Sequence, residues 1–263
     1  MLIYEIIVLI FAGLGAGIVT GFVGASAVSI AAPLMIIFLG YDAFTAIGIS
    51  LAIDVFASTV TAYVFRKHNR VKIIPSLIIL ISAVAGAFIG SFFSSYFPTS
   101  LLAKTVGFFS ILTGLSFMKK DIKDNLQSFR NKLKIDQKWV RVTLSIFSGL
   151  IVGLIAGIFG AGGGITLLVI LTVILGFRIH TAIGTSVFIM AFIALSGTVG
   201  HLVYGSIPWY PFVIAAIAGV IGAYYAATKT NGISEENLQK LIGFIFFVLG
   251  LFLLLKELII FFA

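Results

Sequence analysis

The sequence predicts an all-α polytopic membrane protein built from two inverted-topology repeats. Three observations lead to this fold class. The chain is 60% hydrophobic and only 10% charged, whereas a soluble domain carries about 25% charged residues. The sequence repeats once at an offset of 136 residues, and internal repeats of this kind are typical of secondary transporters. Finally, the positive charges gather in loops whose counterparts in the other repeat lack them.

The repeat extends without a gap over about 110 residues. It is clearest in the motif Thr-Ala-Ile-Gly-x-Ser, which stands at 45–50 and again at 181–186. A glycine-rich stretch at 21–25 likewise returns at 157–161. The expected domains are a first membrane repeat at 1–118, a charged cytoplasmic linker at 119–138 and a second membrane repeat at 139–263.

Each repeat divides into five apolar segments, of which four are long. A membrane-spanning helix needs about 20 apolar residues, and the segments 26–40 and 163–176 are shorter than that. Each of these two is either a short tilted span or the returning arm of a re-entrant hairpin, so the sequence predicts 8 to 10 membrane segments. The ten segments are 2–22, 26–40, 44–65, 73–96, 101–118, 140–159, 163–176, 181–204, 208–228 and 236–260.

The distribution of Lys and Arg predicts the orientation in the membrane. These residues gather at 66–72 and 119–141, and cytoplasmic loops are the ones enriched in positive charge. The stretch equivalent to 66–72 in the second repeat, 202–208, carries no Lys or Arg. Such a difference between equivalent loops is what inverted repeats require. We expect both termini outside the cytoplasmic membrane and the linker inside, so the net charge of +8 reflects orientation and not nucleic-acid binding.

The glycine-rich stretches at 21–28 and 157–164 interrupt the apolar segments, and these two breaks are the expected substrate site. Irregular backbone at membrane depth survives only where protein or water satisfies its polar groups. Each break precedes the start of a short helix, whose free N–H groups and positive dipole end attract anions. The alternative is that these glycines only allow tight helix packing. The expected substrate-binding residues in the breaks are Gly24, Ala25, Ser26, Gly160, Gly162, Gly163 and Gly164.

The duplicated Thr-Ala-Ile-Gly-x-Ser motif adds hydroxyl groups near these breaks. Ser50 and Ser186 occupy equivalent positions, and Thr185 precedes the second of them. Hydroxyls can donate hydrogen bonds to a bound ligand, so we expect these three residues to bind substrate. The alternative is that they pack helices together as small residues.

Together, the glycine-rich breaks, the short helices, the Thr-Ala-Ile-Gly-x-Ser motif and the duplication resemble the sulfite exporter TauE/SafE family of membrane permeases. The resemblance covers essentially the whole chain and is closer in the second repeat, because Ser26, Ala27 and Val28 replace three glycines in the first. It implies movement of a small sulfur-containing anion, of the sulfite, sulfonate or sulfoacetate type, across the cytoplasmic membrane. It implies no cofactor.

Two ionisable residues within the predicted spans are the expected ion-coupling sites. Asp54 is the only acidic residue deep in a span. A charge there costs on the order of 3 kcal/mol, so it usually faces a cavity and marks an ion or proton pathway. His201 can change its charge near neutral pH. For both residues the alternative is a hydrogen-bonded side chain that serves only packing.

We therefore expect a secondary transporter that works by alternating access and is coupled to protons through Asp54. Its partners would be a small anionic substrate, the lipid bilayer and a coupling proton or cation. The alternatives are an anion channel and a transporter of a non-sulfur anion. We expect no enzyme activity, no cofactor and no metal, because no catalytic, nucleotide or metal motif is present and the chain contains no Cys.

Overall fold

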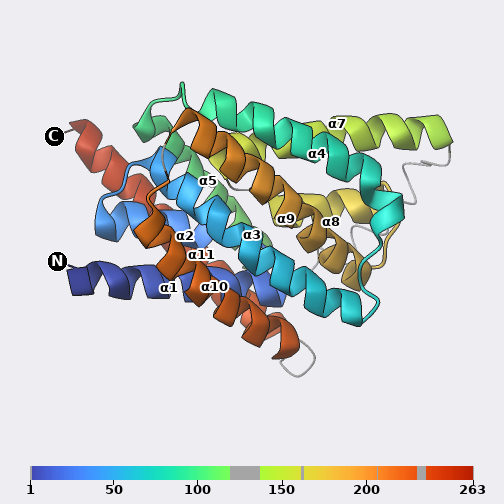
Figure 1. The fold of residues 1–263 in the computed structure, drawn as a ribbon, viewed down its shortest axis with the longest axis horizontal. Helices are drawn as coiled ribbons and strands as arrows, with labels where there is room; N and C mark the ends of the chain where they lie inside the picture. The colour runs from blue at the N-terminus through green and yellow to red at the C-terminus, as the bar shows by residue number, and fades with distance from the viewer. Residues whose placement is uncertain (1, 119–136, 161–162, 206, 230–234, 263) are drawn as a thin grey trace.

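The computed structural model describes residues 2–118, 137–160, 163–205, 207–229 and 235–262, and within these ranges the protein is helical without strands. Most of the expected linker at 119–138 lies outside the described residues. In the first half the helices are α1 (Leu2–Val23), α2 (Val28–Leu34), the π-helix η1 (Met35–Leu39), α3 (Ala43–Lys67), α4 (Ile73–Ser94) and α5 (Thr99–Met118). The second half follows with α7 (Lys138–Phe159), α8 (Gly163–Val173), α9 (Ile179–Tyr204), α10 (Trp209–Lys229) and α11 (Glu235–Phe262) (Figure 1).

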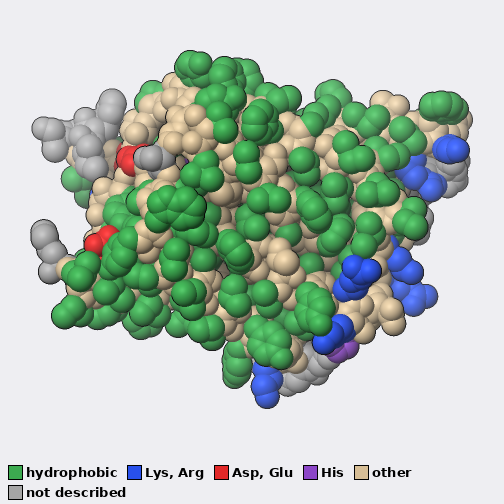
Figure 2. All heavy atoms as spheres, in the orientation of Figure 1, with side chains coloured by type: hydrophobic (Ala, Val, Ile, Leu, Met, Phe, Trp, Pro, Cys, Tyr) green, Lys and Arg blue, Asp and Glu red, His purple; other side chains and the backbone are tan. Residues whose placement is uncertain are grey.

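Eight of the described helices are long and apolar enough to cross a membrane: α1, α3, α4, α5, α7, α9, α10 and α11. Hydrophobic side chains cover most of the face seen in Figure 2, while the visible Lys and Arg side chains gather at one end. In a bilayer an apolar outer surface needs no further covering. The predicted all-α, multi-pass membrane fold is therefore confirmed.

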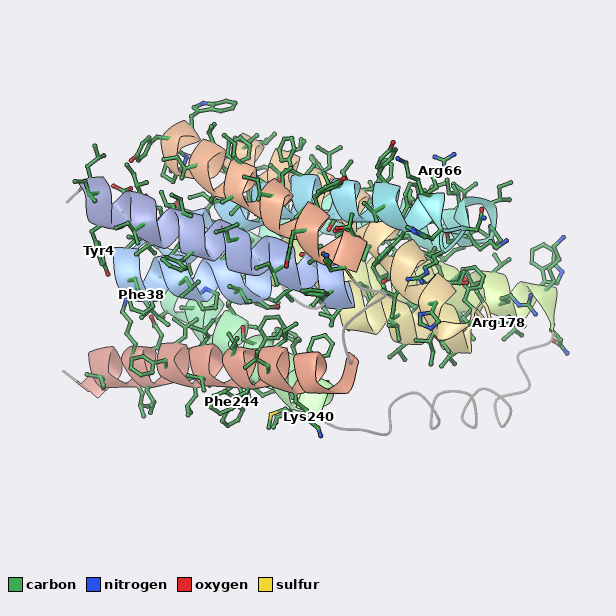
Figure 3. All side chains as sticks on the ribbon, turned by 90° about the horizontal axis from the view of Figure 1, so that it is seen from below. Tyr4, Phe38, Arg66, Arg178, Lys240 and Phe244 are labelled. Carbon is green, nitrogen blue, oxygen red and sulfur yellow. The ribbon has the colours of Figure 1, made fainter. Side chains whose placement is uncertain are left out.

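The segment 26–40 is the returning arm of a hairpin with α1. The Tyr41 hydroxyl donates a hydrogen bond to Glu5 Oε1 at 2.6 Å, and the Tyr4 hydroxyl donates to the Phe38 carbonyl at 3.3 Å. Tyr4 and Glu5 belong to the start of α1, so the end of η1 lies beside the point where α1 begins (Figure 3). The chain thus enters α3 on the side from which it entered α1.

Left-handed glycines end equivalent helices in the two halves. Gly24 and Gly160 follow α1 and α7 with φ of +69° and +67°, and Gly40 and Gly176 follow the short segments with φ of +69° and +70°. Glycine has no Cβ to oppose this conformation, which is why it so often ends a helix. The members of each pair are 136 positions apart, so the helix ends repeat with the sequence.

The long helices pack in pairs through small residues. α1 runs parallel to α10, with Gly13 against the backbone of Ala215 and Gly17 against that of Gly219. α4 pairs with α7 in the same way. Without side chains at these points the backbones approach closely, which favours helix association in lipid.

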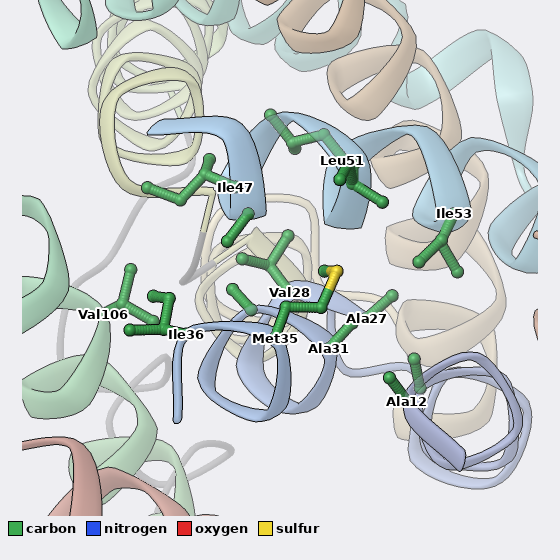
Figure 4. Packing of buried hydrophobic residues seen from close by; sticks show 14 of the residues in the cluster. Ala12, Ala27, Val28, Ala31, Met35, Ile36, Ile47, Leu51, Ile53 and Val106 are labelled. Carbon is green, nitrogen blue, oxygen red and sulfur yellow. The ribbon is translucent and has the colours of Figure 1, made fainter. Parts of the chain in front are cut away.

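α3 and α9 cross at the centre of the molecule in antiparallel directions (Figure 1). Gly48 near the start of α3 faces His201 near the end of α9, and Leu51 of α3 faces Gly197. Behind α3, the short α2 is buried in an apolar cluster (Figure 4). This cluster joins α2 to α1, α3 and α5 and includes Ala12, Ala31, Met35, Ile47, Leu51 and Val106. The packing fixes the start of α2 in the interior.

Candidate functional site

A cavity of about 250 Å³ lies where the two breaks meet. The first break and α2 contribute one wall, the start of α8 a second, and α5 a third. None of the described lining residues is charged, but five carry hydroxyl groups. The lining residues are Ala25, Ser26, Ser29, Phe109, Leu112, Thr113, Ser116, Gly164 and Thr166. Two of these hydroxyls donate within the protein, Ser26 to Asp54 and Ser116 to the Leu112 carbonyl at 2.8 Å. The cavity is thus a neutral site lined by hydroxyl groups.

The two breaks touch each other directly. Gly164 lies against the backbone of Gly24 and Ala25, with no room for a Cβ between them. A Cβ on Gly160 would likewise lie 2.7 Å from Val28 and 2.8 Å from Ile47. The backbone of each break therefore packs closely against residues of the other half of the chain.

The isoleucine of the Thr-Ala-Ile-Gly-x-Ser motif packs on the break of the opposite half. Ile47 faces Gly160, and its equivalent Ile183 faces Gly24. If Gly24 carried a Cβ, that atom would lie 3.2 Å from the Ile183 side chain. The motif therefore helps to position the breaks through its apolar residue. The duplicated Ile of the motif is the signal for this role in the sequence.

The Asp54 carboxylate lies at the start of α2. Its side chain is 1% exposed. Oδ2 accepts a hydrogen bond from the Ser26 hydroxyl at 2.7 Å, and Oδ1 accepts one from the Ser58 hydroxyl at 2.8 Å. The backbone N–H of Ala27, the residue that precedes α2, also donates to it. A carboxylate is favourable at a helix N-terminus, so the protein's own anion occupies the position that the first break would otherwise offer to a ligand.

The second break is chemically different from the first. Met190 stands at the position equivalent to Asp54. It lies beside Gly163, where an added Cβ would be 3.8 Å from the Met190 Cγ. The start of α8 borders the cavity through Gly164 and Thr166. Gly162, which was expected to bind substrate, lies outside the described residues. The two breaks thus differ in charge: one faces a carboxylate and the other a thioether.

The motif hydroxyls lie away from the cavity lining. The Ser50 hydroxyl donates to the carbonyl of Ala46 at 2.7 Å, and the Ser186 hydroxyl donates to that of Ile183 at 2.9 Å. Thr185 Oγ1 accepts a hydrogen bond from the Lys72 backbone N–H at 3.0 Å. Their role in substrate binding stays a prediction, whereas Ala25, Ser26 and Gly164 are brought to the cavity.

His201 is buried near the C-terminal end of α9. Its ring stacks on Phe44 with centroids 4.5 Å apart, and its Nδ1 lies 3.0 Å from the Gly197 carbonyl. Its Nε2 has no hydrogen-bond partner among the described residues. Phe44 and Asp54 are ten residues apart on α3, or about 15 Å. His201 therefore does not join Asp54 at the cavity, and its predicted coupling role remains untested.

Several residues of the site were missed in the sequence. Ser58 lies one helical turn after Asp54, so the spacing could have indicated it. Thr113 and Ser116 come from α5, which carries no motif. Only the crossing of α5 over the breaks makes them part of the cavity wall.

Comparisons with known proteins identify the family. The model of the sulfite exporter TauE/SafE family matches residues 9–253. The chain is 25% identical over 239 residues to the probable membrane transporter protein YdhB of Bacillus subtilis. The aligned region covers 90% of this chain and 96% of that protein. It is also 25% identical over 252 residues to the probable membrane transporter protein YunE of the same organism, with 90% and 91% covered. No solved structure gives a significant match.

These names and the eight apolar helices agree on a multi-pass protein of membrane transport. The family match spans both breaks, the Asp54 carboxylate and the helices that surround the cavity. The chain belongs to the sulfite exporter TauE/SafE family.

Proposed function

We propose that this protein is a secondary transporter that moves a small sulfur-containing anion, of the sulfite, sulfonate or sulfoacetate type, across the cytoplasmic membrane. The observation that carries the proposal is the hydroxyl-lined cavity at the crossing of the two breaks, with the buried Asp54 carboxylate one hydrogen bond behind it. The family match supports the sulfur-anion class.

The chemistry of the cavity suits a small oxyanion. A desolvated anion needs several converging donors, because an unpaired buried charge is very costly. Five hydroxyl groups and the start of α8 surround the cavity. Its volume of about 250 Å³ equals that of several water molecules at roughly 30 Å³ each. That space is large enough for an SO₃ group with a short substituent.

The arrangement of equivalent helices supports alternating access between two inverted halves. α3 and α9 occupy equivalent places in the repeat, yet they run antiparallel, as the contacts Gly48–His201 and Leu51–Gly197 require. α5 and α11 are also equivalent and antiparallel, with Gly107 against Gly250 and Gly114 against Gly243. In transporters with inverted repeats, one half rocks against the other around a site at their interface. The cavity has that position.

A thermal-shift panel on the purified protein tests the substrate class. A ligand at about 100 times its dissociation constant stabilises the folded state by about 2.7 kcal/mol. We expect a selective response to one member of a set containing sulfite, thiosulfate, taurine, sulfoacetate, sulfate, simple carboxylates and chloride. The response should weaken in Thr113→Val and Ser116→Ala, whose side chains line the cavity, and persist in the control Ser95→Ala, which is exposed between α4 and α5.

Two results would contradict the proposal. A response to carboxylates alone would indicate a transporter of a non-sulfur anion. Anion flux through liposomes that rises linearly with the driving force, without saturation, would indicate a channel.

We propose that the chain lies with both termini outside and the linker in the cytoplasm. Support comes from Figure 3, where Arg66 and Arg178 lie at one end of the molecule and Tyr4 and Phe38 at the other. Because the chain has no Cys, single cysteines report sidedness directly. An impermeant maleimide should label Tyr96→Cys in intact cells and Lys67→Cys only after permeabilisation; both native side chains are exposed. The reverse labelling pattern would overturn the orientation.

A further inference from the structure

We propose that Ser26 transmits the protonation state of Asp54 to the substrate cavity by turning its hydroxyl proton. With Asp54 ionised, the proton of Ser26 points to the carboxylate. With Asp54 protonated, Ser26 accepts a hydrogen bond from Asp54 and donates its own proton into the cavity. This inference rests on the proposed function, and it names the residue that couples anion binding to proton binding.

Ser26 is the only described residue whose side chain both lines the cavity and forms a hydrogen bond with the Asp54 side chain. Its Oγ lies 2.7 Å from Asp54 Oδ2 and 3.3 Å from the carbonyl oxygen of Gly160. The backbone N–H of Val28 donates to the same Oγ at 3.3 Å. The hydroxyl therefore stands between the buried carboxylate, the second break and the open volume of the cavity.

The hydroxyl has one proton and more than one acceptor within reach. A charged acceptor forms the shorter and stronger hydrogen bond, so an ionised Asp54 takes the proton and leaves only lone pairs of Ser26 for the cavity. Lone pairs repel a bound anion. When Asp54 Oδ2 carries a proton, it becomes the donor, because a protonated carboxyl has one O–H to give. The Ser26 proton is then available to an anion in the cavity.

The carboxylate and the anion also interact by charge. An ionised Asp54 one hydroxyl away opposes the binding of an anion, and neutralisation removes that repulsion. Both effects have the same sign. Anion and proton therefore bind cooperatively, and by linkage each raises the affinity of the other by the same factor.

No other titratable group at this depth replaces Asp54 in the described part of the chain. The carboxylate interacts with Ser26, Ser58 and the backbone of Ala27. On α3 itself the nearest charged residues, Asp42 and Arg66, are twelve positions away, or about 18 Å. The charged residues and histidines on the long helices packed against α3 stand toward the helix ends: Glu5, Lys104, His180, His201 and Lys229.

The test measures anion affinity against pH. Thiosulfate and ethanesulfonate serve as probes because neither titrates between about pH 5 and pH 9, so the slope reports the protein alone. In the wild type, affinity should be highest where Asp54 is protonated. It should then fall toward a limit of about tenfold per pH unit, reached where Asp54 is ionised in the free protein and takes up one proton with each anion.

The variants separate transmission from ordinary binding. Ser26→Ala should reduce the ratio of affinities at low and high pH by at least about tenfold, because a hydrogen bond to a charged group is lost from the protonated state alone. Ser26→Thr keeps the hydroxyl and should restore the ratio. Two matched controls should retain the full ratio between the low-pH and high-pH limits. Ser29→Ala alters the cavity lining at a side chain with no hydrogen bond to Asp54. Ser58→Ala removes a hydrogen bond to Asp54 outside the cavity lining, so it should move the pH of the transition without changing its size.

Three outcomes would overturn the inference. The first is a wild-type affinity ratio in Ser26→Ala. The second is an equal loss of the ratio in Ser26→Ala and Ser29→Ala, which would indicate general damage to the cavity. The third is pH-independent binding of thiosulfate or ethanesulfonate by the wild type, which leaves the proposed substrate class intact. Failure of every sulfur anion to bind the wild type would instead remove the proposed function, and this inference with it.

Discussion

Asp54→Asn is expected to uncouple anion movement from the proton gradient while the protein stays folded. Asparagine has nearly the shape of aspartate and can still exchange hydrogen bonds with Ser26 and Ser58, which hold the two carboxylate oxygens at 2.7 and 2.8 Å. It is neutral at every pH and so imitates the protonated state. Removing an ionisable group from the buried interior also removes its desolvation cost. The change is therefore chemical rather than structural.

The expected measurement is uptake into proteoliposomes with and without an imposed pH gradient. In the wild type an inwardly directed proton gradient should drive accumulation. The ratio of internal to external anion should rise by at most about tenfold per pH unit if one proton moves with each anion. In Asp54→Asn, exchange of labelled for unlabelled anion should persist, but the gradient should no longer drive accumulation. Separating exchange from accumulation distinguishes lost coupling from lost folding.

Asp42→Asn is the matched control. Asp42 caps α3 outside the buried interior, where its carboxylate accepts a hydrogen bond from the Thr45 N–H at 2.9 Å. Asparagine caps a helix about as well as aspartate, so this variant should accumulate anion like the wild type. Gradient-driven accumulation that survives in Asp54→Asn would exclude Asp54 as the coupling site and direct attention to His201.

The fold was largely predictable because the bilayer restricts what a sequence can do. Long apolar segments must be helices, and a segment as short as 26–40 between glycines has few alternatives. Length alone did not predict that the segment 26–40 returns to the side where α1 begins. The structure shows this return through the hydrogen bond between Tyr41 and Glu5, which are 36 positions apart. Gly40 and Gly176, which repeat at the same offset as the breaks, were an available signal for the two helix ends.

The chemistry of the site was less predictable because it depends on tertiary contacts. In the sequence the two breaks look like copies of one anion site. In the structure the side chain of Asp54 reaches the start of α2, whereas Met190 occupies the equivalent position near Gly163. The motif predicts that Ser186 binds substrate, but its hydroxyl donates a hydrogen bond to the Ile183 carbonyl of its own helix. Ser side chains in helices often do this. Propensity and spacing do not reveal which way such a hydroxyl turns.

Two neighbouring glycines of the second break are expected to respond oppositely to alanine. Gly164 lies on the backbone of Gly24 and Ala25, and a Cβ there would overlap the Gly24 carbonyl oxygen. Since a backbone carbonyl at a helix end moves only if the crossing of the breaks opens, Gly164→Ala should destabilise the protein by about 2 kcal/mol and abolish transport. A Cβ on Gly163 meets only the Met190 side chain, at 3.8 Å. Because Gly163 does not have a left-handed φ, alanine fits its backbone and reduces the entropy of the unfolded chain, which stabilises by about 0.4–1 kcal/mol. Gly163→Ala should therefore leave stability unchanged or raise it.

Two measurements on both variants, the melting temperature in detergent and anion uptake, distinguish two roles for the glycines. If the break works as a flexible hinge, each alanine stiffens it and both variants lose transport while remaining stable. If the break works because two backbones must touch, only Gly164→Ala loses transport, and it loses stability at the same time. The geometry favours the second role: Gly163 has space for a side chain and Gly164 has none. Equal behaviour of the two variants would show that the contact between the breaks does not limit transport.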